Sequence, residues 1–412
     1  MIDKISADWI LPVSSPPIKN GNILIERSRK KISGFSEPKS EVRDTKSMDI
    51  KHLKGYAIMP ALVNAHTHLF YSAFDVKSIS KESFKNWMEE VISFREKYSF
   101  EAIASSMHSA ANEMYRKGVS LVGNICSDFF NDGEEVEKSL LKGVNFLEWA
   151  GFSQVLAEKF EAAVLKLGEK NRGDGKFKYI PSPHSIYSCD SNMIKRLRVL
   201  SEQRKLPFSI HLAESKAESD LLEKNTGELK AYLSGRGMPD DFLKHQGISP
   251  AMYLDAVGGL FERTLAVHCV YLNDEDIELI SRRRAGIVTC PGSNRFLGNG
   301  IAPLEKFLDK KITIAIGTDS SASNEELDLF REMRILKEEH SAIHSSDIIK
   351  MATKNGAKLL GLDNDYGTIE KDKTADLIAL PLPGEAKEWG AGEVEDYIVK
   401  ECSGNQVERI VV

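Results

Sequence analysis

Short apolar runs and amphipathic stretches alternate along the middle of this 412-residue chain. In the amphipathic stretches, apolar residues recur every three to four positions, as in a helix that buries one face. These stretches include Phe100–Lys117, Ser191–Gln203, Asp274–Arg284 and Leu304–Lys310. The apolar runs, which have the length of buried strands, are Tyr56–Asn64, Val119–Ile125, Gly143–Trp149, Phe177–Pro181, Phe208–His211, Leu265–His268, Gly286–Cys290 and Ile312–Gly317. Eight such runs predict repeated βα units, which close most economically into a parallel (β/α)8 barrel of the TIM type.

The two ends of the chain have a different pattern. Short β-like segments interrupted by turn residues occur near the start, as at Ile23–Ile25, and return near the end at Asp376–Leu380 and Val407–Val412. We expect residues 1–57 and 367–412 to form one small β-sandwich domain, and residues 58–366 to form the barrel. A doubly wound open sheet is the alternative for the middle of the chain, but the sequence has no glycine-rich dinucleotide or phosphate loop to support it.

Polar residues end several of the predicted buried strands. His66 and His68 follow the first run, His211 ends the fifth, His268 ends the sixth, and Asp319 follows the eighth. The carboxyl ends of barrel strands surround the active-site mouth, so these side chains should meet in one cavity. Residues i and i+2 of a strand share a face, which lets His66 and His68 reach one metal ion. A single histidine at a strand end is usually a core or capping residue, whereas this combination indicates a zinc or iron site.

Further candidate residues lie at the same predicted mouth. Glu214 follows His211 by three residues, where it could move protons beside a metal-bound water; the alternative is a glutamate that stabilises a helix start. His184, after the fourth run, is a candidate substrate contact or a structural hydrogen-bonding residue. Arg295, after the seventh run, could bind substrate or fix its loop, and Glu148, in the third run, could be a wall residue or a ligand contact.

The amino-acid composition indicates which partners and which cellular compartment to expect. Asp and Glu number 61 against 55 Lys and Arg, for a net charge of −6, and this acidic balance argues against nucleic acid as a partner. We expect a small-molecule substrate instead. No apolar run is long enough to span a membrane, and the start does not have the pattern of a signal peptide. Five scattered cysteines without a CxxC pair indicate reduced thiols, so we expect a cytoplasmic protein.

Several short sequence motifs follow one another along the chain in the order typical of one protein family. They are Pro60–His68, Ser182–Ser185, His211–Ser215, His268–Leu272, Cys290–Asn294, Gly317–Ser320 and the closing Gly367–Glu370 with Ala375–Ile378. With these motifs the chain resembles the amidohydrolase superfamily, in its branch of chlorohydrolase-like and nucleoside-type deaminases. The resemblance implies a metal held by His66, His68, His211 and Asp319. It also implies catalytic roles for Asp319 and His268 beside the metal-bound water and for Glu214 as the proton carrier.

The resemblance further implies a mononuclear enzyme. Family members with two metals carry a bridging carboxylated lysine, and the third and fourth runs of this sequence do not end in lysine. The implied reaction is hydrolytic deamination of an adenine-like nucleoside by a water bound to one divalent metal, Zn²⁺ or Fe²⁺. Segments around Trp87 and Arg95, which are candidate substrate contacts, are similar to the subgroup linked to aminofutalosine deaminase. Relatives often carry a glutamate two residues after the second metal-binding histidine, where this chain has Phe70.

Two other hypotheses remain open at this point. A hydrolase of the same fold could act on a chlorinated or amino triazine, a guanidine or a cyclic amide. A barrel that retains its metal only as a structural element could instead serve in binding or assembly, although such a protein would need neither Glu214 nor His268. A homodimer is a family expectation.

Overall fold

The computed structural model describes residues 2–36, 48–75, 84–151, 154–173, 175–235 and 247–410. The chain divides into two compact units. The first contains Met1–Asn64, Glu113–Leu121 and Asp328–Val412, and the second contains Ala65–Asn112 and Val122–Leu327. Within the described part of the chain, no helix has the length and apolar character needed to cross a membrane.

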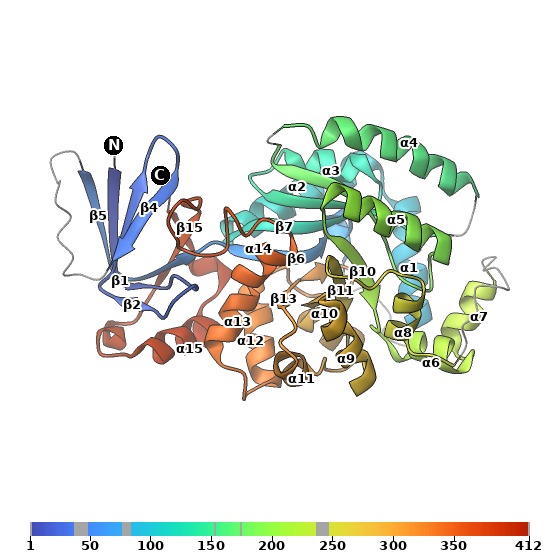
Figure 1. The fold of residues 1–412 in the computed structure, drawn as a ribbon. Helices are drawn as coiled ribbons and strands as arrows, with labels where there is room; N and C mark the ends of the chain where they lie inside the picture. Colours follow the sequence, from blue (N-terminus) through green and yellow to red (C-terminus); the bar gives the residue numbers. More distant parts are fainter. Residues whose placement is uncertain are drawn as a thin grey trace. The chain divides into compact units, whose positions relative to one another are not determined.

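The first unit contains a seven-stranded sheet built from both ends of the chain (Figure 1). Its strands are β1 (Ile2–Ile10), β2 (Ile18–Lys19), β3 (Asn22–Glu26), β4 (Lys31–Ser36), β5 (Met48–Pro60), β15 (Leu377–Pro381) and β16 (Glu408–Ile410). They are ordered β16-β15-β5-β1-β3-β4, with β2 paired to β1. Because β15 pairs with β5 in antiparallel register, Leu377 beside Pro60, the predicted pairing of the two ends is confirmed.

Isoleucines form much of the core of this sheet. Alternate residues of β1 are buried, as expected for a strand with one face against a core. Ile5, Ile23, Ile25 and Ile58 belong to one buried cluster, which also includes Leu377 from the end of the chain. The helices of this unit are α12 (Leu329–Glu339), α13 (Ser345–Met351), α14 (Lys354–Leu359) and α15 (Ala391–Glu401).

The second unit contains the strands that carry the predicted polar ends. They are β6 (Leu62–His68), β7 (Val119–Cys126), β8 (Lys142–Trp149), β9 (Phe177–Pro183), β10 (Phe208–Leu212), β11 (Thr264–His268), β12 (Gly286–Thr289), β13 (Ile314–Ile316) and β14 (Asp319–Ser320), of which β6 and β7 begin in the first unit. The helices between them are α1 (Phe84–Lys97), α2 (Phe100–Arg116), α3 (Phe130–Glu137), α4 (Gln154–Lys170), α5 (Ser191–Arg204), α6 (Lys216–Lys224), α7 (Glu228–Ser234), α8 (Pro250–Ala256), α9 (Asp274–Arg283), α10 (Pro291–Leu297) and α11 (Leu304–Asp309). Helices α4, α5 and α9 lie on the outside of the strands (Figure 1).

In this unit, strands that follow one another in the sequence are neighbours, and the last strand, β14, pairs with the first, β6. One sheet is ordered β14-β6-β7-β8-β9 and the other β10-β11-β12-β13. A parallel bridge between Ser185 and His211 connects the end of β9 to β10, and only Gly317 and Thr318 separate β13 from β14. The pairs β8–β9, β10–β11, β11–β12, β12–β13 and β14–β6 are all parallel. This is the strand order of a TIM-type barrel.

The predicted runs coincide closely with these strands, with one correction. The first run, Tyr56–Asn64, is not a single strand: its first half belongs to β5, and β6 begins at Leu62. The break lies where Pro60, which has no N–H to donate, ends β5. The next residue, Ala61, still bonds to Asp376 on the β15 side, and Leu62 turns to the carbonyl of Gly118. The predicted helices agree with α2, α5, α9 and α11 to within one residue at each end.

Candidate metal centre and active site

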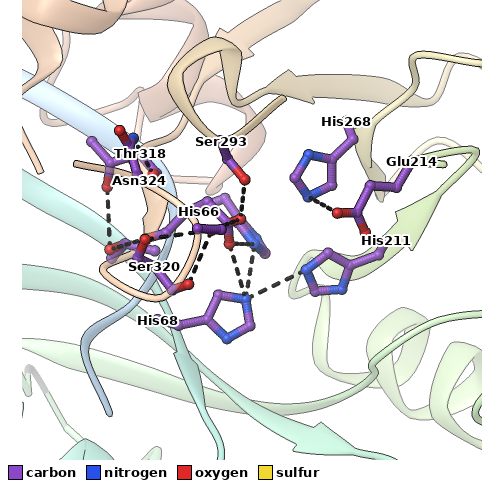
Figure 2. A network of polar contacts seen from close by, with 12 residues as sticks. His66, His68, His211, Glu214, His268, Ser293, Thr318, Ser320 and Asn324 are labelled. Atoms are coloured by element: carbon purple, nitrogen blue, oxygen red, sulfur yellow. Dashed lines mark hydrogen bonds and ion pairs between the residues drawn. The ribbon is translucent and has the colours of Figure 1, made fainter. Parts of the chain in front are cut away.

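Three histidines and one aspartate converge where β6 and β10 end and where β14 begins. His66 and His68 end β6, His211 lies on β10, and Asp319 begins β14. The Nε2 atom of His68 lies 3.1 Å from Nε2 of His66 and 3.4 Å from Nε2 of His211. Asp319 Oδ1 lies 3.5 Å from Nε2 of His68 and 3.6 Å from Nε2 of His66. All four residues are buried, and their ligand atoms lie within 4.8 Å of one another. Figure 2 shows His66, His68 and His211 close together.

This group fits a single divalent cation. Tetrahedral ligands about 2.1 Å from a zinc ion lie ~3.4 Å from one another, which matches the spacing of these atoms. Burial lowers the pKa of His66 to about 4, so its ring is neutral and keeps a lone pair for a metal. Without a cation, the imidazole lone pairs and a carboxylate would face one another in a buried space. The four residues form a metal site, and their donor set suits zinc or iron.

Neighbouring groups orient the ligands. The Nδ1–H of His211 donates to the carbonyl oxygen of His184 at 2.7 Å, which leaves the Nε2 lone pair for the metal. Asp319 Oδ2 accepts hydrogen bonds from the hydroxyls of Ser293 and Ser323, each at 2.6 Å, so that Oδ1 faces the histidines. Such outer contacts are part of the metal site because they fix the tautomer and the direction of each ligand.

The backbone around the site adopts conformations that L-residues rarely take. Ala213, His268, Cys269 and Asp319 have φ values of 50°, 70°, 54° and 59°. Such conformations cost about 1–3 kcal/mol each and are concentrated at functional sites. Close packing also requires Gly317, since a Cβ there would lie 2.6 Å from the carbonyl oxygen of His66. The strand ends are therefore shaped for the side chains that they direct into the site.

A glutamate and a further histidine lie beside the metal ligands. Glu214 is buried in the turn after β10, and its Oε1 lies 3.9 Å from Nε2 of His268 (Figure 2). The same oxygen accepts a hydrogen bond from Asn299 Nδ2 at 3.4 Å. His268 Nδ1 donates to Asn294 Oδ1 at 2.9 Å, which holds the other nitrogen toward the cavity. A carboxyl and an imidazole held in this way can exchange protons with a water or substrate next to the metal.

A cavity of about 650 Å³ contains these groups. This volume lies within the range of small-molecule sites, ~300–1,000 Å³. Glu214, His268 and the metal ligands His68, His211 and Asp319 line it. Aromatic and apolar side chains form much of the remaining lining, among them Trp87, Met88, Val91, Trp149, Tyr187 and Tyr232. The cavity can therefore take a partly apolar small molecule that also carries polar groups.

Only some of the predicted substrate contacts line the cavity. Trp87, Glu148 and His184 line the cavity. Trp87 Nε1 donates to the carbonyl of Ala322 at 2.8 Å. Arg295 is exposed on α10 and is not part of the cavity lining, because the same helix turns Ser293 and Asn294 inward. Arg95 falls on α1, but its side chain lies outside the described residues.

The sequence analysis gave no role to four residues that contact Asp319, His268 or Glu214. Ser293 and Asn294 were part of a turn motif but received no role. Asn299 has no local signal, since 85 residues separate it from Glu214. Glu218 does have one: Ser215 followed three residues later by a glutamate is the pattern of a capping box.

The strand order and the metal site are those expected of a TIM-type barrel enzyme with a metal centre. The model of the amidohydrolase family matches residues 57–407, and the chain belongs to this family of hydrolases. The match covers the described strands β6–β14, which carry the metal ligands.

Three known proteins show the range of its relatives. The 5-methylthioadenosine/S-adenosylhomocysteine deaminase of Halothermothrix orenii is 28% identical over 96% of this chain and 88% of its own length. The aminofutalosine deaminase of Helicobacter pylori, solved with methylthio-coformycin, is 23% identical, with a TM-score of 0.85 over 99% of this chain and 100% of that one. The atrazine chlorohydrolase TrzN of Arthrobacter aurescens TC1, solved with zinc, is 17% identical, with a TM-score of 0.80 over 98% and 94% of the two chains.

Proposed function

We propose that this protein is a metal-dependent aminohydrolase that deaminates an adenine-like nucleoside. The observation that carries the proposal is the presence of Glu214 and His268 beside the His66, His68, His211 and Asp319 group in one cavity. A structural metal would need neither proton-exchanging group. Relatives over nearly the whole chain deaminate adenine nucleosides, according to their names.

The proposed chemistry assigns a role to each group. A zinc ion held by the three histidines and Asp319 would act as a Lewis acid and lower the pKa of a water molecule. Glu214 protonates a ring nitrogen of the substrate, which makes the adjacent amino-bearing carbon electrophilic. Asp319 and His268 orient the attacking water and accept its proton, which then passes to the amino group. The C–N bond breaks, ammonia leaves, and the proton of the new hydroxyl returns to Glu214 as the carbonyl forms. Ser293 and Ser323 hold Asp319 for this role.

The substrate proposed first is 6-amino-6-deoxyfutalosine, an intermediate of menaquinone biosynthesis. Support comes from the similarity of the segments around Trp87 and Glu148 to the aminofutalosine deaminase subgroup. Methylthioadenosine, adenosylhomocysteine and 5′-deoxyadenosine are the other nucleosides that the relatives' names suggest. We propose that Trp87, Glu148 and His184 contact the nucleoside from the cavity wall.

The test is metal analysis followed by ammonia release from a panel of substrates. The panel contains adenosine, methylthioadenosine, adenosylhomocysteine, aminodeoxyfutalosine, guanine and cytosine. Near one equivalent of zinc or iron, with turnover of an adenine nucleoside, is the expected result and names the substrate. Two equivalents of metal without ammonia release would contradict the proposal and favour a cyclic amide. Turnover of an amino or chlorinated triazine alone would favour the second candidate, for which the fold similarity to the chlorohydrolase is the supporting observation.

The remaining proposals concern architecture and setting. We propose that residues 58–366 form a closed (β/α)8 catalytic barrel and that residues 1–57 and 367–412 form a β-sandwich domain. The cysteines of the described chain are buried and form no disulfide, which supports action in the cytoplasm. A homodimer is proposed from the family resemblance and is testable by light scattering.

A further inference from the structure

A second glutamate next to the active site is completely buried. Glu218 lies in the first turn of α6, and none of its surface is exposed. Glutamates are rarely buried to this extent without a partner, because removing a carboxylate from water is costly. Burial raises the pKa of Glu218 to about 8. Helix-capping residues normally remain near solvent. A glutamate buried at this position needs a hydrogen-bonding partner.

That partner is the backbone of Glu214. In a capping box, the glutamate accepts a hydrogen bond from the N–H of the N-cap residue, here Ser215. Only half of that box is present: Ser215 Oγ accepts from the N–H of Glu218 at 3.3 Å. The carboxyl of Glu218 reaches one residue further, and its Oε2 accepts from the N–H of Glu214 at 3.0 Å.

This hydrogen bond holds a peptide unit whose orientation decides where Glu214 points. Ala213 has a φ of 50°, so the chain turns sharply between the end of β10 and Glu214. The carbonyl of Ala213 accepts from the N–H of Tyr271 at 2.9 Å, which fixes the turn on the side of β11. Glu218 holds the N–H of the same peptide unit. The direction of the Glu214 side chain depends on both contacts.

We propose that Glu218 is a positioning residue, whose carboxyl holds the peptide between Ala213 and Glu214 so that the Glu214 carboxyl faces the cavity. The inference rests on the proposed function for the role of Glu214, but the geometry can be tested without activity. Reach is the property that matters, not charge. The side chain must span the distance from α6 to the N–H of Glu214, and an amide oxygen at the same place would serve as well.

Two conservative variants separate reach from acidity. Glu218→Gln keeps the length and an accepting oxygen but removes the ionisable carboxyl, whereas Glu218→Asp keeps a carboxyl but is one methylene shorter. Glu332 on α12, which is also completely buried, offers the matched controls Glu332→Gln and Glu332→Asp. Each variant is first analysed for bound zinc, and kcat and KM are then measured per metal-loaded enzyme. Hydrogen exchange of the peptide that covers residues 211–218 is measured by mass spectrometry.

We expect Glu218→Asp to lower kcat about 10- to 100-fold, the effect of a catalytic group displaced by about 1 Å, with KM little changed. Glu218→Gln should retain most of the wild-type kcat, and exchange over residues 211–218 should accelerate in the Asp variant only. The Glu332 variants should alter neither readout. A Gln variant as impaired as the Asp variant, or an Asp variant with wild-type kcat and exchange, would overturn the proposal.

The exchange measurement also keeps the two proposals distinct. If the wild-type protein deaminates no nucleoside, the proposed function fails. Faster exchange in Glu218→Asp than in Glu218→Gln would still support the positioning role, and equal exchange would overturn it.

Discussion

At the residue scale, the side chain of Glu214 makes the strongest prediction. Glu214→Gln keeps the shape of the side chain and the oxygen that accepts from Asn299, but it cannot transfer protons. We expect kcat to fall about 10²- to 10⁴-fold, the usual contribution of general acid–base catalysis, with the metal content unchanged. Steady-state kinetics with the panel substrate that turns over fastest would measure it.

Glu223→Gln is the matched control for this substitution, since Glu223 is exposed on α6, the helix that follows Glu214. Its kcat should equal that of the wild type. Wild-type turnover by Glu214→Gln would contradict the catalytic role. If that variant also kept its metal and the protein's function, a barrel with a purely structural metal would be favoured.

Ser293 makes a separate prediction about metal affinity. Its hydroxyl donates to Asp319 Oδ2, and loss of such an outer contact typically weakens metal binding about 10- to 100-fold. Ser293→Ala should show this loss in a competition titration with a chelator, while its kcat at saturating zinc stays near wild type. Ser281→Ala, which removes a hydroxyl bonded to the carbonyl of Lys310, is the control. Unchanged affinity in Ser293→Ala would mean that Ser323 alone suffices to orient Asp319.

The metal ligands were predictable from sequence, but the residues that hold them were not. His66 and His68 share a strand face, and each other ligand lies at the end of an apolar run, so local patterns place all four at one mouth. Asn299 and Ser293 act across long stretches of sequence and leave no periodic signal. Arg295 was a candidate substrate contact because it follows a predicted strand. A helix that follows a strand turns only some of its residues inward, and Arg295 is exposed.

At the scale of elements, α9 offers a prediction about stability alone. Asn273 caps this helix: its side chain accepts from the N–H of Asp276 at 2.9 Å, and Asp276 accepts from the N–H of Asn273 at 3.2 Å. Asn273→Ala should lower the free energy of unfolding by ~1 kcal/mol, and Asn273→Asp should restore most of it. Urea unfolding would measure the change, with kcat as the control. An unchanged unfolding midpoint for the alanine variant would show that the cap contributes nothing.

Strand positions were predictable because buried parallel strands are continuous apolar runs. The first run failed for the same reason: the end of β5 and the start of β6 are both apolar, so nothing in hydropathy marks the change of sheet at Pro60. Strand β14 has two residues, too few for any periodicity, and Asp319 was placed by its position after a run instead. Length and hydropathy thus predict long buried elements, while sheet membership depends on pairing partners far along the chain.

At the scale of the whole molecule, the metal site joins residues of β6, β10 and β14, so a bound metal ion should stabilise the fold. A ligand that binds only the folded state adds RT ln(1 + [L]/Kd), which is ~2.7 kcal/mol at a concentration 100 times Kd. We therefore expect a strong chelator to lower the Tm of the protein and added zinc to restore it. Differential scanning fluorimetry with parallel metal analysis would measure both changes.

Two histidine variants test whether this stabilisation acts through the proposed site. His211→Ala removes a ligand, so its Tm should respond little to chelator or to zinc. His108, exposed on α2, is the matched position, and His108→Ala should keep the full response. If chelation removed the metal from the wild type without lowering Tm, the packing of the strands alone would hold β6, β10 and β14 in place. The strained backbone at Ala213, His268 and Asp319 would then be stabilised by protein contacts, and the metal would serve the reaction only.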